Sequence, residues 1–328
     1  MMISVALSLA LLATSPAQQA TAPAPAPQTT TPADPDGVVD LGDISVSGRR
    51  LDEATQEFVR EVGAPARGRG LARWRNGVCI GVANLRNETA QYIADRVSTV
   101  AEDVGLKAGE PGCEPSVLII AVTDANAFTQ AFVERRPRLF IVGGGGMDLG
   151  RSGLERFKTN DQPVRWWTVS MPVDADTGLI ATRLPGEEAP TVSTFASRLT
   201  TQIVDDTKRA FVIVDIDKIG GVSLQQLSDY LAMVVLAQVD PNADTSSYST
   251  VLNVFKDPGQ TEGLTDWDKA YLEGLYDATR TRINHASHRN EIASSIIRVH
   301  NRMTAEQIAA EDAENAKAAP ETAARPTP

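Results

Sequence analysis

The chain has 328 residues, a net charge of −11 and 42% hydrophobic residues. A chain of this size can bury the core of one large domain or of two joined lobes. Its acidity argues against nucleic-acid binding, because phosphate contacts need a basic face, and the sequence contains no motif for a nucleotide or redox cofactor.

The two ends of the chain differ in composition from its middle. An apolar run over residues 3–13, followed by small residues, predicts an export signal over residues 1–17, with an uncleaved anchor as the alternative. Residues 18–40 are rich in Ala, Pro, Thr and Gln, which predicts a disordered linker. We expect a single domain over residues 41–300, an Ala- and Glu-rich helical or disordered tail over residues 301–328, and a periplasmic or secreted location.

The chain has two cysteines, Cys79 and Cys113. An exported protein meets an oxidising compartment, where a single pair is usually joined. The sequence therefore predicts one disulfide, and two buried thiols are the alternative.

Hydrophobic periodicity in the first half of the domain indicates alternating strands and helices. Apolar runs of strand length cover residues 77–85 and 116–123, and helical spacing covers residues 87–104 and 124–134. This order predicts a layered α/β core. It also places Cys79 and Cys113 near neighbouring elements.

A basic stretch, residues 67–75, interrupts the acidity with four arginines and a tryptophan. Such a stretch can meet an anionic polymer or lipid headgroups. The alternative is a loop whose arginines pair with surface acids.

Residues 164–173 and 178–185 each alternate between apolar and polar side chains, and a turn sequence separates them. This pattern predicts a β-hairpin. Trp166 and Trp167 are adjacent in its first strand, so they face opposite sides of the sheet. We expect one of them in the core and regard both as possible apolar contacts of a cleft.

A further strand over residues 210–217 and a glycine turn precede a helix over residues 223–236. Zincin peptidases place His-Glu-x-x-His on such a helix, since residues four apart share a face. Here the corresponding letters are Gln225, Gln226 and Asp229. Glutamine is a poor zinc ligand and no general base, so we predict no metal and no catalytic residue at this place.

The segment over residues 264–277, "LTDWDKAYLEGLYD", contains Asp266 and Asp268. Together with the preceding strand and helix, it resembles the C-terminal part of a family of uncharacterised secreted bacterial proteins with a zincin-like, metalloprotease-related fold. The resemblance implies a layered α/β (α+β) core with a mixed sheet and a motif-bearing helix, and it assigns no substrate. The departures from the zinc motif prevent any transfer of catalytic residues.

The three histidines of the chain are late in the sequence. His285, His288 and Glu291 are three residues apart, which would place them on roughly one face of a helix. A metal site there is the minor alternative, and exposed polar residues are the main expectation.

These observations lead to two functional hypotheses. The first is an exported, catalytically silent zincin-like module of the cell envelope that serves in binding or structure, with an envelope protein, a peptide or a glycan as its partner. The second is a peptidase-like hydrolase with an unconventional site built from Asp229, Asp266, Asp268 or the late histidines.

Overall fold

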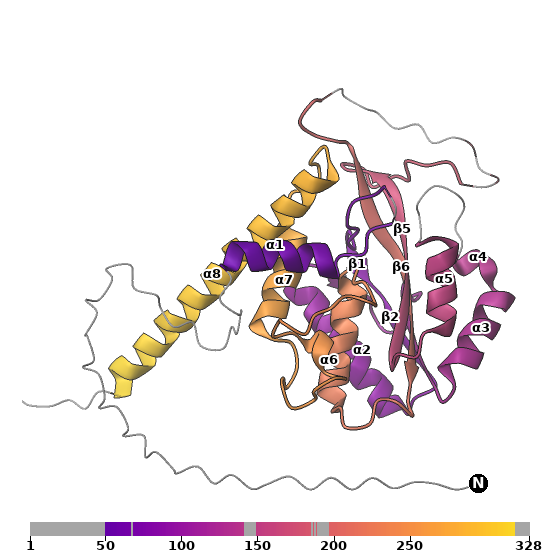
Figure 1. The fold of residues 1–328 in the computed structure, drawn as a ribbon, viewed down its shortest axis with the longest axis horizontal. Coiled ribbons are helices and arrows are strands. Elements are labelled where there is room, and N and C mark those ends of the chain that lie inside the picture. The colour runs from indigo at the N-terminus through magenta and orange to yellow at the C-terminus, as the bar shows by residue number, and fades with distance from the viewer. Residues whose placement is uncertain are drawn as a thin grey trace, which may run out of the picture. The chain divides into compact units, whose positions relative to one another are not determined.

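The computed structural model describes residues 50–318, apart from Arg67, residues 141–148, Pro185, Glu187 and residues 189–196. All of them belong to one compact unit, residues 41–328. The predicted export signal and linker lie outside the described residues. Within these, eight α-helices and two sheets give an α/β fold (Figure 1).

The main sheet has four strands in the order β2-β4-β6-β5. Three of them are parallel, namely β2 (Ile80–Ala83), β4 (Val117–Val122) and β6 (Ile203–Asp215). The fourth, β5 (Val164–Asp174), pairs antiparallel to β6 and ends the sheet. The sheet is therefore mixed, as predicted. A second, two-stranded sheet joins β1 (Gly77–Val78) to β3 (Lys107–Ala108).

Helices cover both faces of the main sheet (Figure 1). Successive residues of a strand point to opposite faces, and two hydrophobic clusters result, one on each side. One face is covered by α3 (Ala125–Arg135), α4 (Pro137–Phe140) and α5 (Gly150–Thr159). The other, larger cluster involves α1 (Leu51–Val62), α2 (Asn87–Asp103), α6 (Leu224–Leu236), α7 (Asp266–Asp277) and α8 (His285–Ala318). A short 3-10 helix, η1 (Val251–Asn253), precedes α7.

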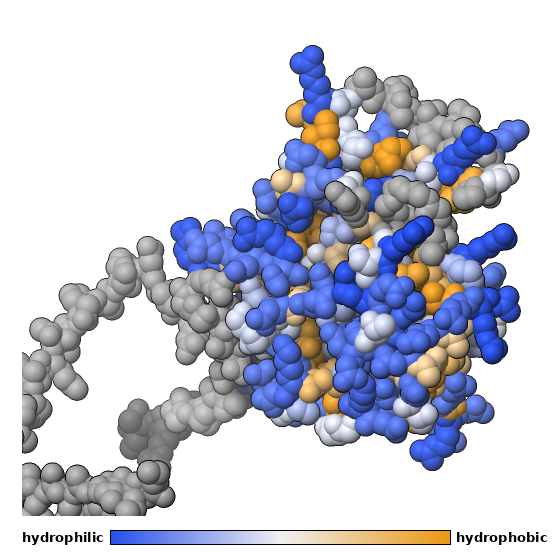
Figure 2. All heavy atoms as spheres, turned by 45° about the vertical axis from the view of Figure 1, so that its right-hand side comes forward, coloured by the Kyte–Doolittle hydropathy of each residue, from blue (hydrophilic) through white to orange (hydrophobic). Residues whose placement is uncertain are grey.

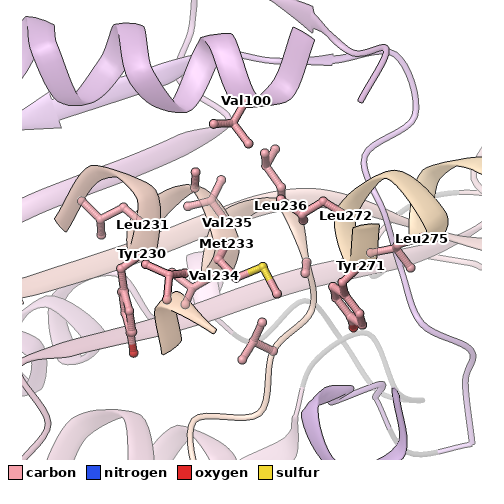
Figure 3. Close-up of a cluster of buried hydrophobic side chains, with 14 of the residues drawn as sticks. Val100, Tyr230, Leu231, Met233, Val234, Val235, Leu236, Tyr271, Leu272 and Leu275 are labelled. Atoms are coloured by element: carbon pink, nitrogen blue, oxygen red, sulfur yellow. The ribbon is translucent and has the colours of Figure 1, made fainter. Parts of the chain in front are cut away.

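Helix α6 lies in the middle of the larger cluster. Every residue from Gln226 to Leu236 is buried. Figure 3 shows its apolar side chains beside Val100 of α2 and Leu272 of α7. A helix that is apolar on most of its surface is expected to be enclosed by other elements. None of the described helices is long and apolar enough to cross a membrane.

The predicted hairpin over residues 164–185 is only partly right. The chain turns back as expected, and Val173 and Ile180 form an antiparallel bridge flanked by two backbone hydrogen bonds. Along the rest of its length, strand β5 pairs with β6, which begins at Ile203. The predicted first strand is present as β5, but the strand that pairs with it along its length follows a long connection. The side-chain pattern of one strand does not identify which other strand it pairs with.

The disulfide between Cys79 and Cys113 is confirmed, with a Cα–Cα distance of 6.1 Å. It joins the segments just before β2 and β4, two neighbouring parallel strands. Gly109 packs against it, since a Cβ atom there would lie 2.5 Å from the Cys113 sulfur. The bond fixes the edge of the sheet where both strands begin.

Candidate ligand-binding groove

Gln226 stabilises the start of α6 and the loop before α7. Its Oε1 accepts from the backbone N–H of Ser223 at 2.8 Å, and the Ser223 hydroxyl accepts from the Gln226 N–H at 3.1 Å. This reciprocal pair is a capping box that begins α6. The Gln226 amide nitrogen also donates to the carbonyls of Pro258 and Thr261, at 2.7 and 2.6 Å. The side chain thus ties the start of α6 to the loop before α7.

Asp229 is 1% exposed and is also engaged. One carboxylate oxygen accepts from Arg96 of α2, and the other accepts from the backbone N–H of Leu264 at 2.9 Å. A Cβ atom on Gly263 would lie 2.2 Å from that second oxygen, so only glycine fits there. Gln225 is exposed, but its side chain lies near the same glycine. The loop through Gly263 therefore covers the face on which a zincin would hold its metal.

A restored zinc motif tests this arrangement. We expect the triple variant Gln225→His, Gln226→Glu, Asp229→His to fold less stably than the wild type and to bind no stoichiometric zinc. The Glu at 226 loses two donated hydrogen bonds, and Arg96 loses its buried partner, at a cost of about 1–3 kcal/mol for each unsatisfied group. Metal analysis and thermal unfolding with zinc and with a chelator would measure both effects. Stoichiometric zinc with a higher midpoint would contradict the account.

The other groups considered for hydrolysis do not converge with Asp229. Asp268 is fully buried and completes a second capping box, with Thr265, at the start of α7. Asp266 is half-exposed and bonds Lys269 and Gln307. His285 and His288 lie at the start of α8, and no cluster of three or more His, Cys, Asp or Glu side chains able to hold a metal exists in the described part of the chain.

Trp166 and Trp167 lie on opposite faces of β5, and both are buried. The Trp166 indole donates to the Val239 carbonyl at 3.0 Å and packs near Tyr230 of α6. The Trp167 indole donates to the Phe140 carbonyl at 3.1 Å and packs near Phe157 of α5. The prediction that they lie on different sides of the sheet is confirmed. Both are core residues, and each also lines a pocket.

Two pockets adjoin along β5 and share Trp166 and the segment 240–242. The larger one has a volume of about 400 Å³ and is lined by the apolar side chains of Trp166, Tyr230, Leu252 and Phe255. The smaller one, about 220 Å³, lies between residues 63–65 and α5. We call the two together the β5 groove. Gln225, Gln226 and Asp229 line neither pocket.

Two neutral polar side chains, Tyr230 and Gln162, line the larger pocket of the β5 groove. Burial raises the pKa of Tyr230 far above its ordinary value, so its phenol stays neutral. Among the described residues, nothing hydrogen-bonds the buried Oε1 of Gln162. The Gln162 amide nitrogen is occupied by the Pro241 carbonyl at 2.5 Å. A neutral donor and a neutral acceptor suit an uncharged polar ligand group.

The backbone of β5 adds hydrogen-bonding groups at the same place. The Asp215 N–H donates to the Pro163 carbonyl at 2.8 Å, which makes these opposite residues a hydrogen-bonded pair. Such pairs alternate in an antiparallel ladder, so the backbone groups of Trp166 and Thr168 point away from β6. Beside these two residues no described strand lies on that side, and within the described residues no hydrogen bond reaches their N–H groups; the bridge of Val173 to Ile180 covers only the far end of β5. The edge of β5 is therefore unpaired here, and Trp166, although only 6% exposed, brings it to both pockets of the groove.

Sequence reasoning located Trp166 and Trp167 but missed Gln162, Tyr230 and the segment 240–242. Tyr230 is an aromatic residue in an apolar helix and Gln162 is a glutamine in a loop, and neither pattern indicates a binding site. Comparisons with protein-family models, with curated proteins and with solved structures found no match. The functional argument therefore depends on the geometry of this chain.

Proposed function

We propose that this chain is a non-enzymatic binding module that takes an extended peptide along the open edge of β5. The observation that carries the proposal is the coincidence of that edge with two adjoining pockets. Peptides that add a strand to a sheet edge gain affinity from main-chain hydrogen bonds and specificity from pockets for alternate side chains.

The chemistry of the groove suggests the kind of peptide. The larger pocket can take an apolar or aromatic side chain against Trp166, Tyr230 and Phe255, and Gln162 adds a polar side chain to its lining. Arg156 lies exposed at the smaller pocket, where it would favour an acidic side chain. We therefore propose a ligand with an apolar residue and, further along, an acidic one.

The sequence hypotheses on location and ancestry form part of this proposal. The apolar run over residues 3–13 and the disulfide support an exported envelope protein. A zincin-like origin is supported by the order of strand β6, glycine turn, helix α6 and the segment 264–277. Asp229 is engaged by Arg96 and Leu264, and His285 and His288 line a different pocket, so these groups share no site; this favours binding over hydrolysis.

A blocked groove tests the proposal. A binding peptide is first selected on the wild-type chain from a random seven-residue library. We then expect Asn242→Trp, at an exposed position shared by both pockets, to weaken its affinity by about tenfold or more, because the indole competes for a pocket.

The matched control is Asn76→Trp, which makes the same exchange at an exposed loop position lining neither pocket. Titration calorimetry on both variants measures the effect. Equal affinities of the two variants, or selection of no peptide at all, would contradict the proposed function.

A further inference from the structure

A third pocket, of about 120 Å³, lies away from the β5 groove and gathers basic side chains from distant parts of the sequence. Arg69 comes from the stretch before β1, Arg280 and Arg282 follow α7, and His285 and His288 begin α8. We call it the arginine pocket. The basic stretch and the late histidines, which were separate features of the sequence, meet here.

Two of the arginines are held in place by β6, and Arg282 pairs with Glu291 of α8. Arg69 pairs with the Asp205 carboxylate, which also accepts the Gly70 N–H at 3.0 Å. Arg280 donates to the Asp205 carbonyl and, at 2.7 Å, to Asp206. Each of these two guanidiniums uses one terminal nitrogen in these bonds, so further N–H groups of the planar fork remain for a ligand.

Basic side chains outnumber acidic ones in the lining of the pocket, although the protein is acidic. Arg69, Arg280 and Arg282 line it with the Asp205 carboxylate, and Asp206 and Glu291 pair with Arg280 and Arg282 from outside the lining. The first turn of α8 adds the positive end of a long helix dipole.

The positive charges around the pocket also act on His288. Burial, and then the charges of Arg280, Arg73 and His285, lower the pKa of His288 to about 4, and Glu291 opposes them. At neutral pH the imidazole is therefore uncharged. Its Nδ1 lies against Gly70, where a Cβ atom would be 3.1 Å away.

We propose that the arginine pocket binds a phosphate group. Arginine forks match phosphate oxygens in charge and geometry, and rigidly held arginines lose little entropy on binding. The pocket, about 120 Å³ in volume, has room for a phosphate group beside these arginines. This site is independent of the proposed peptide groove.

Apolar side chains beside the pocket favour a phosphate carried by a lipid headgroup. Thr200 bridges to Arg282, and the neighbouring Leu199 and Ile283 are 79% and 48% exposed. Figure 2 shows hydrophobic residues among strongly hydrophilic ones at the upper end of the molecule, near the grey atoms. Such a mixture suits the boundary between headgroups and acyl chains.

The first experiment uses the full chain and two matched variants. Arg282→Gln removes a half-exposed charge that lines the pocket, and Arg298→Gln removes a similarly exposed charge on α8 outside it; both side chains contact Glu291. At constant ionic strength, we expect glycerol 3-phosphate to bind the wild type and Arg298→Gln equally and Arg282→Gln about tenfold more weakly. Equal binding by all three, or none, would overturn the proposal.

The second measurement identifies the site and the source. Proton NMR of the three histidines is expected to show a higher His288 pKa with inorganic phosphate than with chloride, and no rise would contradict the proposed pocket. Phosphatidylglycerol vesicles, with phosphatidylcholine as reference, should bind the wild type more tightly than Arg282→Gln. All variants share the same N-terminal apolar run, so its contribution cancels. Binding of soluble phosphate alone would support the pocket and reject the lipid source.

Discussion

Replacing Asp206 by Ala is expected to lower the free energy of unfolding by about 3 kcal/mol at neutral pH, the lower end of the range for a broken buried ion pair. The Asp206 side chain is fully buried and bonds Arg75 and Arg280 at 2.7 Å and Lys208 at 3.2 Å. Its removal leaves three cations without their shared partner. These cations are partly exposed, and water therefore reduces the cost.

The same variant predicts a pH dependence. Burial acts to raise the pKa of Asp206, but the hydrogen bonds from Arg75 and Arg280 and the nearby positive charges outweigh it and hold the pKa below its ordinary value. A lowered pKa stabilises the folded state above the unfolded pKa of about 4, and this contribution is lost as the pH falls through the folded value. The stability difference between wild type and Asp206→Ala should therefore shrink below about pH 4.

Urea unfolding at several pH values would measure both effects. Asp161→Ala is the control, because it removes an aspartate whose side chain is 86% exposed and pairs with Lys218 at the surface. We expect little change in that variant. A loss at neutral pH no larger for Asp206→Ala than for Asp161→Ala would contradict the structural role of Asp206.

Loss of the disulfide is the second large expected effect. The double variant Cys79→Ser, Cys113→Ser is expected to be about 3–4 kcal/mol less stable than the oxidised wild type, because the bond closes a long loop in the unfolded chain. The sequence separation is 34, and the bond joins the starts of two paired strands. Reductant should destabilise the wild type and leave the double variant unchanged. Two titratable thiols in the unreduced native protein would contradict the prediction.

Much of the sheet and its helices could be predicted from sequence, because the local pattern determines them. The continuous apolar run of β4 is typical of a strand covered on both faces, and the structure places it inside the sheet. Helix α2 follows its helical spacing, and Gly105 ends it with a φ of +82°. The helix expected over residues 124–134 is α3, and Asp124 caps its start.

Long-range pairing could not be predicted in the same way. The partner of β5 is β6, which begins at Ile203 after a long connection. The local pattern of β5 does not show that it pairs with this strand. Helix α8 extends back to His285, although the sequence there is polar, because Ile292 and Ile296 pack into the core. At Gly274 of α7, a Cβ atom would lie 2.6 Å from the Ile296 backbone, so glycine allows the two helices to approach closely.

The candidate site shows what sequence reading can miss. Ser223 and Gln226 have the spacing of a capping box, a structural signal that was present in the sequence beside the comparison with a zinc motif. Thr265 and Asp268 repeat the same spacing in α7. The open edge of β5, by contrast, follows from strand order, which no local pattern contains.

The most direct test of the central claim, peptide binding along β5, is amide hydrogen exchange by NMR with and without the selected peptide. The Trp166 and Thr168 amides point to the open edge, whereas the Trp167 amide faces β6 in the ladder. We predict slower exchange of the first two on binding and no change for the third. Unchanged exchange at Trp166 and Thr168 in the presence of saturating peptide would contradict the account.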